Sequence, residues 1–285
     1  MERQIEQIVT NILKTKVTYV KRLLGGMSNY TCILKDENNK YYTFRIPGKN
    51  ADKFVDRNEE KYNLELLTNF NLTTKTLYLD TNTGYKISEF IEGDILSEVG
   101  FESYLDLISE SLHQLHNLDC KAYDDYNKLK RLQKYEEYCK ELNYKIDDKY
   151  YEYKKIYLNL YNEFKDYPKV FSHGDFQPSN LIHKDNKIYI VDFEFTANND
   201  PYYDIACFGN INFCDAVSLL KVYLNRDYTK EEYKRLIENR LFQTLQWYLV
   251  ATYKNLIGLS EDLKLDFNKI ATNYLIKSKD LIDLL

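Results

Sequence analysis

The chain has 285 residues, of which 39 are basic and 44 acidic, and its formal net charge is −5. This length suits one large domain or two modest lobes, and a hydrophobic fraction of 44% supports a folded core. The sequence has no basic patch or arginine-rich run, which argues against a nucleic acid as substrate or partner.

The sequence also bears on the cellular compartment. No stretch approaches the ~18 uninterrupted apolar residues that a membrane-spanning helix needs, and the run MERQIEQIVTNILK lacks the apolar core of a signal peptide. The five cysteines are scattered and show no CxxC spacing, as is usual for reduced thiols in a cytosol. We therefore expect a cytoplasmic protein that does not span a membrane.

The first part of the chain is expected to form a helix followed by antiparallel strands. Apolar spacing predicts an amphipathic helix over residues 2–14, and strands are expected over residues 17–24, 31–34 and 41–46. The first corner between strands is Gly25–Gly26–Met27–Ser28–Asn29. Hairpin corners need glycine in any case, but backbone N–H groups at such a corner also suit nucleotide phosphates. We expect Gly26, Ser28 and Asn29 to bind nucleotide.

Arg45 lies on the third strand and points to the opposite face from its two neighbours. It can therefore face a cleft while those neighbours face the core, and a permanently charged guanidinium suits phosphate oxygens. Residues 52–70 are expected to form a helix in which Glu60 shares a face with Leu64 and Leu67. This places Glu60 on the buried side of the helix.

Strands expected at residues 77–79 and 85–90 lead into a candidate lobe connector, residues 88–93. Backbone groups of Glu89 and Ile91 would hydrogen-bond an adenine ring there. The pattern then becomes helical, with helices expected over residues 101–118, 128–166 (one or two helices), 203–224, 229–258 and 261–285. We expect an α+β protein with a nucleotide-binding lobe over residues 1–92 and a catalytic, substrate-binding lobe over residues 93–285.

Residues 180–192 are expected to form a β-hairpin with Asp185 and Asn186 at its tip. The numbers of facing residues then add up to 371, so Asn180 faces Val191, next to Asp192. Directly opposed residues lie about 5 Å apart. An amide and a carboxylate placed together suit a hard cation such as Mg²⁺, which keeps positions for water and phosphate oxygens. We expect Asn180 and Asp192 to be Mg²⁺ ligands.

Asp175 lies on the loop His173–Gly174–Asp175, five residues before Asn180. On this loop it is free to receive a proton from a substrate hydroxyl. An Asp-x4-Asn loop, a strand and an Asp-Phe-Glu sequence follow one another in the order that kinase-type phosphotransfer uses. The alternative, that these acids are surface turn residues, does not explain the ordered combination. Glu194 is expected either to assist a second metal ion or to be structural.

The segments HGDFQPSN and VDFEFTANNDPYYDIA resemble the aminoglycoside-phosphotransferase and choline-kinase superfamily, and within it the bacterial choline/ethanolamine kinases. The resemblance covers most of the chain. It implies a protein-kinase-like, two-lobed fold with a small antiparallel-sheet lobe and a larger, mainly helical lobe. It also implies ATP-dependent phosphorylation of a small amino alcohol, with choline as the first candidate, phosphocholine as the product, and ATP and Mg²⁺ as cofactors.

The resemblance also implies roles for residues outside the hairpin. Arg45–Ile46–Pro47–Gly48 is similar to the family's arginine segment. The family pattern Asp-Arg-x-x-Glu matches residues 56–60, which makes Glu60 the expected partner of Arg45, with Glu59 as the alternative. Asp204 resembles the buried aspartate that braces the catalytic loop.

For the substrate, the resemblance implies a site with aromatic faces. Gln177 matches the glutamine of the family's Asp-x-Gln-x-x-Asn loop, and Phe195 stands where the family often has tyrosine. Trp247 and Tyr248 fall in the helix in which the family carries its choline-cage tryptophans. Aromatic rings and carboxylates are what a quaternary ammonium group needs. A core role for Trp247 is the alternative.

The chain departs from the family pattern at two places in this region. Gln243 or Thr244 replaces one of two tryptophans, and the acidic residue often seen after Asp-Ile-Ala is missing, with Asp215 as a stand-in. Three functions therefore compete: a choline or ethanolamine kinase, a kinase of the same fold for an aminoglycoside, thiamine or a sugar, and an inactive binding module. The intact set Asp175, Asn180 and Asp192 argues against the third.

Overall fold

The computed structural model describes residues 1–23 and 29–285, which form two compact units. Unit 1 consists of Met1–Asp124 and His173–Ala197, and unit 2 of Asp125–Ser172 and Asn198–Leu285. Unit 1 therefore also contains residues 93–124 and the segment around Asp175. The functional division into lobes after residue 92 stays a prediction.

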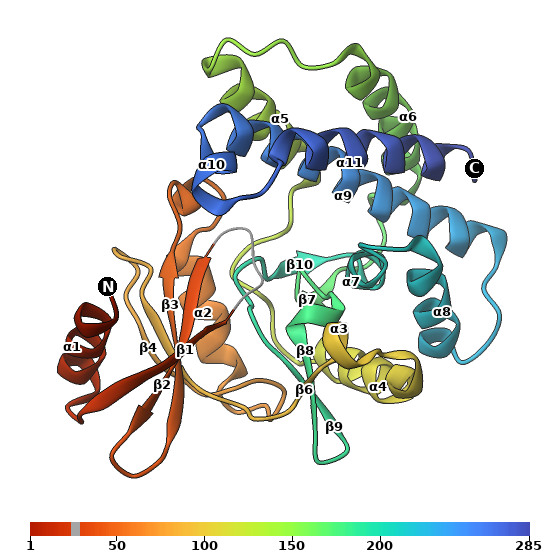
Figure 1. Ribbon diagram of the computed structural model, residues 1–285. Helices are drawn as coiled ribbons and strands as arrows, with labels where there is room; N and C mark the ends of the chain where they lie inside the picture. Colours follow the sequence, from red (N-terminus) through yellow and green to blue (C-terminus); the bar gives the residue numbers. More distant parts are fainter. Residues whose placement is uncertain (24–28) are drawn as a thin grey trace. The chain divides into compact units, whose positions relative to one another are not determined.

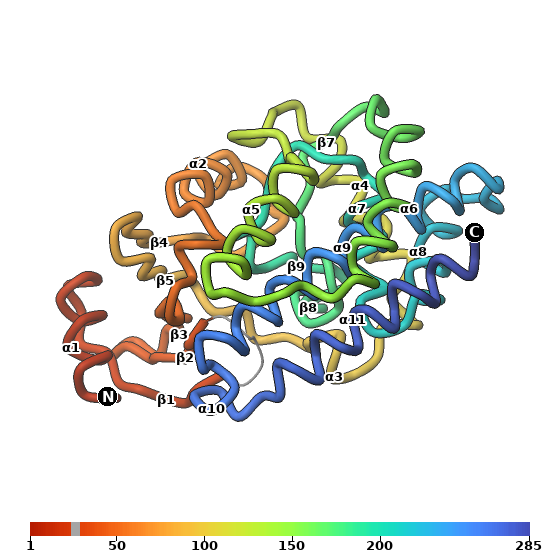
Figure 2. The backbone as a smooth tube through the Cα atoms, turned by 90° about the horizontal axis from the view of Figure 1, so that it is seen from above, coloured from red at the N-terminus to blue at the C-terminus, as the bar shows by residue number. Residues whose placement is uncertain are grey.

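Unit 1 contains a five-stranded antiparallel sheet with the strand order β1–β2–β3–β5–β4. Its strands are β1 (Val17–Leu23), β2 (Asn29–Asp36), β3 (Tyr41–Pro47), β4 (Thr76–Leu79) and β5 (Lys86–Glu89). The helix α1 (Glu2–Leu13) lies beside β1 in Figures 1 and 2 and buries Ile5 and Val9 in the core of the sheet. The expected N-terminal helix and the strands that follow it are confirmed.

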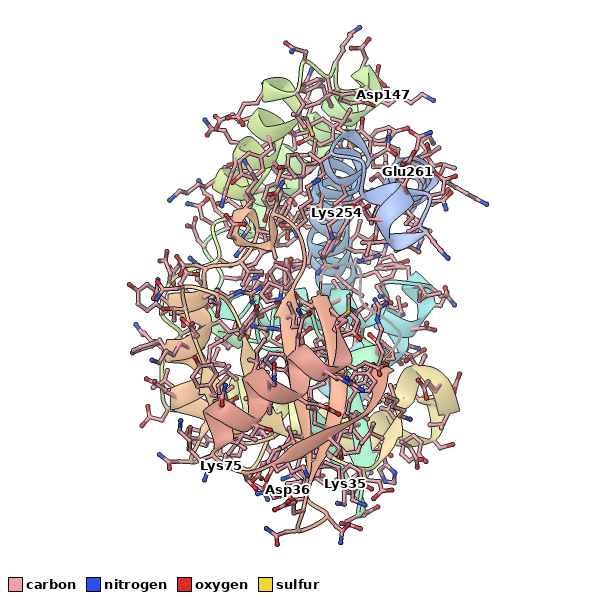
Figure 3. The ribbon with its side chains drawn as sticks, turned by 60° about the vertical axis from the view of Figure 1, so that its left-hand side comes forward. Lys35, Asp36, Lys75, Asp147, Lys254 and Glu261 are labelled. Carbon is pink, nitrogen blue, oxygen red and sulfur yellow. The ribbon has the colours of Figure 1, made fainter. Side chains whose placement is uncertain are left out.

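Asp36, labelled in Figure 3 at the end of β2, closes the turn between β2 and β3. Its Oδ1 accepts hydrogen bonds from the backbone N–H groups of Asn38 and Lys40, and its Oδ2 accepts one from the Tyr42 hydroxyl. Carboxylates at such positions replace backbone partners in a tight turn. The turn fixes the register of β3, the strand that carries Arg45.

The helix α2 (Arg57–Leu67) is shorter than the predicted helix over residues 52–70. Asp56 is its N-cap, because its carboxylate accepts hydrogen bonds from the N–H groups of Asn58 and Glu59. An aspartate at the N-cap sets the start of the helix, and the residues before it include a separate 3₁₀ turn, Ala51–Lys53. The residues that α2 buries include Arg57, Glu60 and Asn63.

A second sheet in unit 1 carries the segment that follows Asp175. Its strand order is β6–β8–β9, with β6 (Asp94–Ile95), β8 (Leu181–Lys184) and β9 (Lys187–Ile190). The numbers of all paired residues of β8 and β9 add up to 371, so the predicted register is confirmed. Asp185 and Asn186 at the tip have φ of 50° and 57°, as a type I′ turn requires. The helices α3 (Leu96–Val99) and α4 (Leu105–His116) complete this unit.

Unit 2 is mainly helical. Its helices are α5 (Lys128–Glu141), α6 (Asp148–Phe164), α7 (Pro201–Phe208), α8 (Phe213–Leu224), α9 (Lys230–Leu256), α10 (Leu259–Leu263) and α11 (Phe267–Ile282). Helix α9 is buried along most of its length and packs against α5, α6, α7 and α11 (Figures 1 and 2). The strands β7 (Val170–Ser172) and β10 (Ala197–Asn199) form a two-stranded sheet. Within residues 1–23 and 29–285, none of the helices combines the length and the apolar character needed to cross a membrane.

Several predicted helices have later starts or are divided in two. The predicted helix over residues 203–224 is interrupted after Phe208, and Asn212 caps α8 by accepting a hydrogen bond from the N–H of Cys214. The region 128–166, predicted as one or two helices, forms two, because Asp147 caps α6. Asp266 caps α11, so the predicted helix over residues 261–285 is divided between α10 and α11. These short polar side chains stabilise helix starts rather than helix interiors, which is why the predicted single helices over residues 203–224 and 261–285 were wrong.

We predict that Asn186→Val destabilises the protein, because a β-branched residue at a left-handed position costs about 1–2 kcal/mol. The free energy of unfolding from urea denaturation checks this. Lys184→Val is the matched control, since residue 184 lies on the extended strand β8. Equal stability of the two variants would contradict the role of the turn.

Candidate active site

His173 connects the loop that carries Asp175 to the end of β9. The backbone N–H of Asp175 donates to Nδ1 of His173 at 3.2 Å. Because Nδ1 is an acceptor, the proton is on Nε2, which donates to the carbonyl oxygen of Val191 at 3.0 Å. The fully buried imidazole therefore acts as a neutral crosslink between the loop and the residue that precedes Asp192.

Gly174 brings the same loop into direct contact with the segment after Asp192. Its φ is +82°, and a Cβ at this position would lie 2.2 Å from the carbonyl oxygen of Phe195. Only glycine permits both this conformation and this approach. The loop 173–175 and the segment 192–196 therefore pack backbone against backbone.

The two carboxylate oxygens of Asp175 differ in their hydrogen bonds within the described part of the chain. Its Oδ2 accepts hydrogen bonds from Gln177 Nε2 at 3.0 Å and from Asn180 Nδ2 at 2.9 Å. Among the residues that the structure describes, none donates to Oδ1. Burial raises the pKa of Asp175 well above its ordinary value, and the charge of Asp192 raises it further. Asp175 and Asp192 are thus close enough for their charges to interact.

Asn180 and Asp192 lie at the open end of the hairpin. The N–H of Val191 donates to the carbonyl oxygen of Asn180 at 2.9 Å, so the pairing continues to the residue before Asp192. The amide nitrogen of Asn180 donates to Asp175, which leaves its side-chain oxygen for another partner. The Asp192 side chain is 36% exposed. One amide oxygen and one carboxylate form a donor set that fits Mg²⁺ bound also by phosphates and water.

This donor set differs from that of a metal site made by the protein alone. Over residues 1–23 and 29–285, no group of three or more histidine, cysteine, aspartate or glutamate side chains is arranged to hold a metal ion. Magnesium sites in phosphotransfer typically use one or two carboxylates and take the other ligands from substrate phosphates and water. The site around Asp192 matches that second type.

Arg45 and Glu60 form a buried ion pair. Two nitrogens of the Arg45 guanidinium donate to the two oxygens of Glu60 at 2.6 and 2.8 Å, so the expected partner is Glu60 and not Glu59. Burial alone would raise the pKa of Glu60, but the positive charges of Lys86 and Arg45 hold it well below its ordinary value. Arg45 Nη1 also lies 3.7 Å from Asp192 Oδ1, which joins the pair to the hairpin end.

Glu194, two residues after Asp192, is surrounded by positive charge and amide donors. Its Oε2 accepts from Arg57 Nη1 at 3.0 Å and from Arg45 Nη1 at 3.5 Å. Asn29 Nδ2 donates to both carboxylate oxygens at 3.2 and 3.3 Å. The sequence did not assign a role to Arg57, although its position three residues before Glu60 puts both side chains on one face of α2.

The predicted nucleotide-binding residues are only partly described. Gly26 and Ser28 lie outside the described residues, whereas Asn29 contacts Glu194. The N–H of Glu89 donates to the carbonyl oxygen of Lys75 at 3.0 Å, so this backbone donor already has a partner within the protein. Ile91 follows in a loop with no backbone hydrogen bond to the rest of the described chain. Adenine binding by Glu89 and Ile91 stays a prediction.

The predicted substrate residues of unit 2 differ in exposure. Trp247 is half-buried, whereas Tyr248 is 3% exposed. The Tyr248 ring stacks on Tyr150, and its hydroxyl accepts a hydrogen bond from the N–H of Asp147. These contacts favour a packing role for Tyr248, while a substrate role for Trp247 stays a prediction. Asp204 is fully buried in α7, and its bracing role also stays a prediction.

Gln243 and Thr244, the two candidates for the position of an expected tryptophan, are both fully buried and hydrogen-bond to neighbouring helices. Gln243 Nε2 donates to the carbonyl oxygen of Tyr203 on α7 at 2.9 Å. The Thr244 hydroxyl accepts a hydrogen bond from the Ser278 hydroxyl of α11 at 2.8 Å. Both side chains are 0% exposed. These hydrogen bonds join α9 to α7 and α11, at positions where a tryptophan would have offered an aromatic face.

Residues 20–271 match the family model for choline/ethanolamine kinase. The chain belongs to the choline/ethanolamine kinase family. Family membership confirms the resemblance seen in the motifs, and it makes the protein a kinase-like phosphotransferase that acts on an alcohol group. The nucleotide-binding function expected from the sequence agrees with this membership.

Individual relatives agree with the family assignment. Protein LicA of Haemophilus influenzae is 25% identical over 245 residues, which are 81% of this chain and 72% of LicA. The crystal structure of choline kinase LicA from Streptococcus pneumoniae is similar with a TM-score of 0.79 at 23% identity, over 99% of this chain and 100% of that one. The GDP complex of wild-type aminoglycoside 2′-phosphotransferase-IIIa has a TM-score of 0.69 at 15% identity, over 98% of each chain. The predicted kinase-like α+β fold is confirmed.

We predict that Gly174→Ala lowers the melting temperature more than Gly258→Ala. Both glycines have a positive φ, but a Cβ at Gly258 would meet no atom within 4 Å, whereas one at Gly174 would overlap the backbone of Phe195. Thermal unfolding of the two variants checks this. Equal melting temperatures would show that the loop and the segment after Asp192 are not in contact.

Proposed function

We propose that the protein transfers the γ-phosphoryl group of ATP to the hydroxyl of choline and so forms phosphocholine. The observation that carries the proposal is the meeting of Asp175, Asn180 and Asp192 at one hairpin end within unit 1. The match to the choline/ethanolamine kinase family over residues 20–271 supports it. That a solved relative is a choline kinase supports choline as the acceptor.

Asp175 is the proposed catalytic base. Gln177 and Asn180 both hold its Oδ2, which orients Oδ1 as the acceptor for the substrate hydroxyl. In phosphoryl transfer the transition state is loose, so orientation of the hydroxyl matters more than a strongly basic carboxylate. Gln177 then positions Asp175, and a direct contact of Gln177 with the substrate is not needed for this role.

Asn180 and Asp192 are the proposed holders of Mg²⁺. When bound, the ion would neutralise negative charge on the ATP phosphates. The protein keeps the two oxygen donors in place. The hydrogen bond to Asp175 holds Asn180, and the backbone pairing at the hairpin end holds Asp192. Arg45 adds positive charge beside this pair, although its guanidinium already donates to both oxygens of Glu60.

Each unit carries one half-buried aromatic side chain that the sequence assigned to the substrate, Phe195 in unit 1 and Trp247 in unit 2. An aromatic face of this kind attracts a quaternary ammonium group. Because Gln243 and Thr244 are buried crosslinks, α9 offers fewer aromatic faces than two tryptophans would. We expect the protein to act in the cytosol on this small alcohol and not on nucleic acid.

We predict that purified protein with ATP and Mg²⁺ releases ADP in a choline-dependent manner. The assay compares choline with ethanolamine, thiamine and aminoglycosides. In Asp175→Ala, choline-dependent release falls by at least about 100-fold, because a positioned base typically contributes that much or more. Asp106→Ala is the matched control, since Asp106 is an exposed aspartate of α4 in the same unit. Turnover with an aminoglycoside alone would rule out the choline assignment.

We predict that Asp192→Ala abolishes turnover at every Mg²⁺ concentration, because Asn180 alone leaves the ion without a carboxylate ligand. Steady-state ADP release across a Mg²⁺ titration checks this. Activity that returns to the wild-type rate at high Mg²⁺ would refute the assignment of Asp192 as an essential metal ligand.

A further inference from the structure

Asp192 has a strained backbone that its surroundings must hold. Its φ is +68°, a left-handed conformation that is uncommon for residues other than glycine. Such conformations persist only where neighbouring contacts determine them, and they concentrate at functional sites. On the N-terminal side, the hydrogen bond between His173 and the carbonyl oxygen of Val191 fixes the preceding residue.

On the C-terminal side, two residues of α2 hold the chain after Asp192. Arg57 Nη1 donates to Glu194 Oε2 at 3.0 Å. Asn63 Nδ2 donates to the carbonyl oxygen of Thr196 at 3.0 Å, while Asn63 Oδ1 accepts a hydrogen bond from the N–H of Tyr123 at 2.9 Å. Asn63 is fully buried and Arg57 is 7% exposed, so both contacts are shielded from water.

The same nitrogen of Arg57 also joins Glu194 to the Arg45–Glu60 pair. Arg57 Nη1 lies 2.7 Å from Glu60 Oε2, so a single guanidinium group bridges two buried carboxylates. The carboxylate of Glu194 is further occupied by Asn29 and Arg45. Glu194 is thus a counter-ion of Arg57, held mainly through Oε2, while its Oε1 accepts from Asn29 Nδ2 at 3.3 Å.

We propose that Arg57 is a positioning residue that fixes the metal-binding conformation of Asp192 through Glu194. This inference rests on the proposed function, because it takes Asp192 as a ligand of nucleotide-bound Mg²⁺. Groups that orient a metal ligand without touching the metal typically change metal affinity by about 10- to 100-fold when removed. Arg57 is such a group for Asp192, because it binds Glu194, which lies two residues after Asp192 in the chain.

The test compares the affinity for ADP with and without Mg²⁺ by isothermal titration calorimetry. In the wild type, the Kd of ADP in EDTA divided by the Kd in Mg²⁺ measures how much the metal strengthens binding. In Arg57→Met this ratio falls by about tenfold, and kcat with choline falls with it. Lys61→Met is the matched control, because Lys61 is an exposed lysine of the same helix α2; its ratio stays at the wild-type value.

Other outcomes separate this inference from the proposed function. A folded Arg57→Met variant with a lower melting temperature but an unchanged ratio would overturn the positioning role. A wild-type ratio of one would overturn the metal site at Asp192, and the inference with it. If Arg57→Met does not fold, Arg57→Gln decides the matter, because glutamine removes the positive charge that faces both Glu60 and Glu194. We expect a reduced ratio in Arg57→Gln, and an unchanged ratio contradicts the positioning role.

Discussion

The candidate active site depends on the register of a single hairpin, β8–β9. Side chains alternate between the faces of a strand, so a slip by one residue would turn Asn180 away from Asp192. The two-residue turn at Asp185 and Asn186 sets this register, and the hydrogen bond from the N–H of Val191 to Asn180 extends it to the hairpin end. Backbone hydrogen bonds therefore decide where the proposed metal ligands meet.

The charged side chains around the hairpin end form two groups. Glu60 and Glu194 face the cations Arg45, Arg57 and Lys86, and burial of such ions is tolerated only when they are paired. Asp175 and Asp192 form the second group: among the described residues, Arg45 Nη1 lies 3.7 Å from Asp192 Oδ1, and the pKa of Asp175 is raised by burial and by the charge of Asp192. A nucleotide-bound cation would add positive charge to this second group.

Short-range rules account for what could be predicted from the sequence. Apolar periodicity and turn residues predicted α1, the N-terminal strands and the hairpin register, and helix spacing predicted that Glu60 is buried. Helix starts were misplaced where Asp56 or Asp266 acts as a cap. The roles of Arg57 and Asn63 were missed because their partners are 137 and 133 residues away in the chain, and no local pattern records such contacts.

The central claim is that Asn180 and Asp192 hold a divalent cation on the nucleotide phosphates beside Asp175. Diffraction from crystals grown with ADP and Mn²⁺ tests it most directly, because Mn²⁺ gives an anomalous signal at its own position. The account predicts an anomalous peak with the side-chain oxygens of Asn180 and Asp192 as ligands, at about 2.0–2.2 Å, as for Mg²⁺. An anomalous peak at another position, with neither Asn180 nor Asp192 bound to the metal ion, would contradict it.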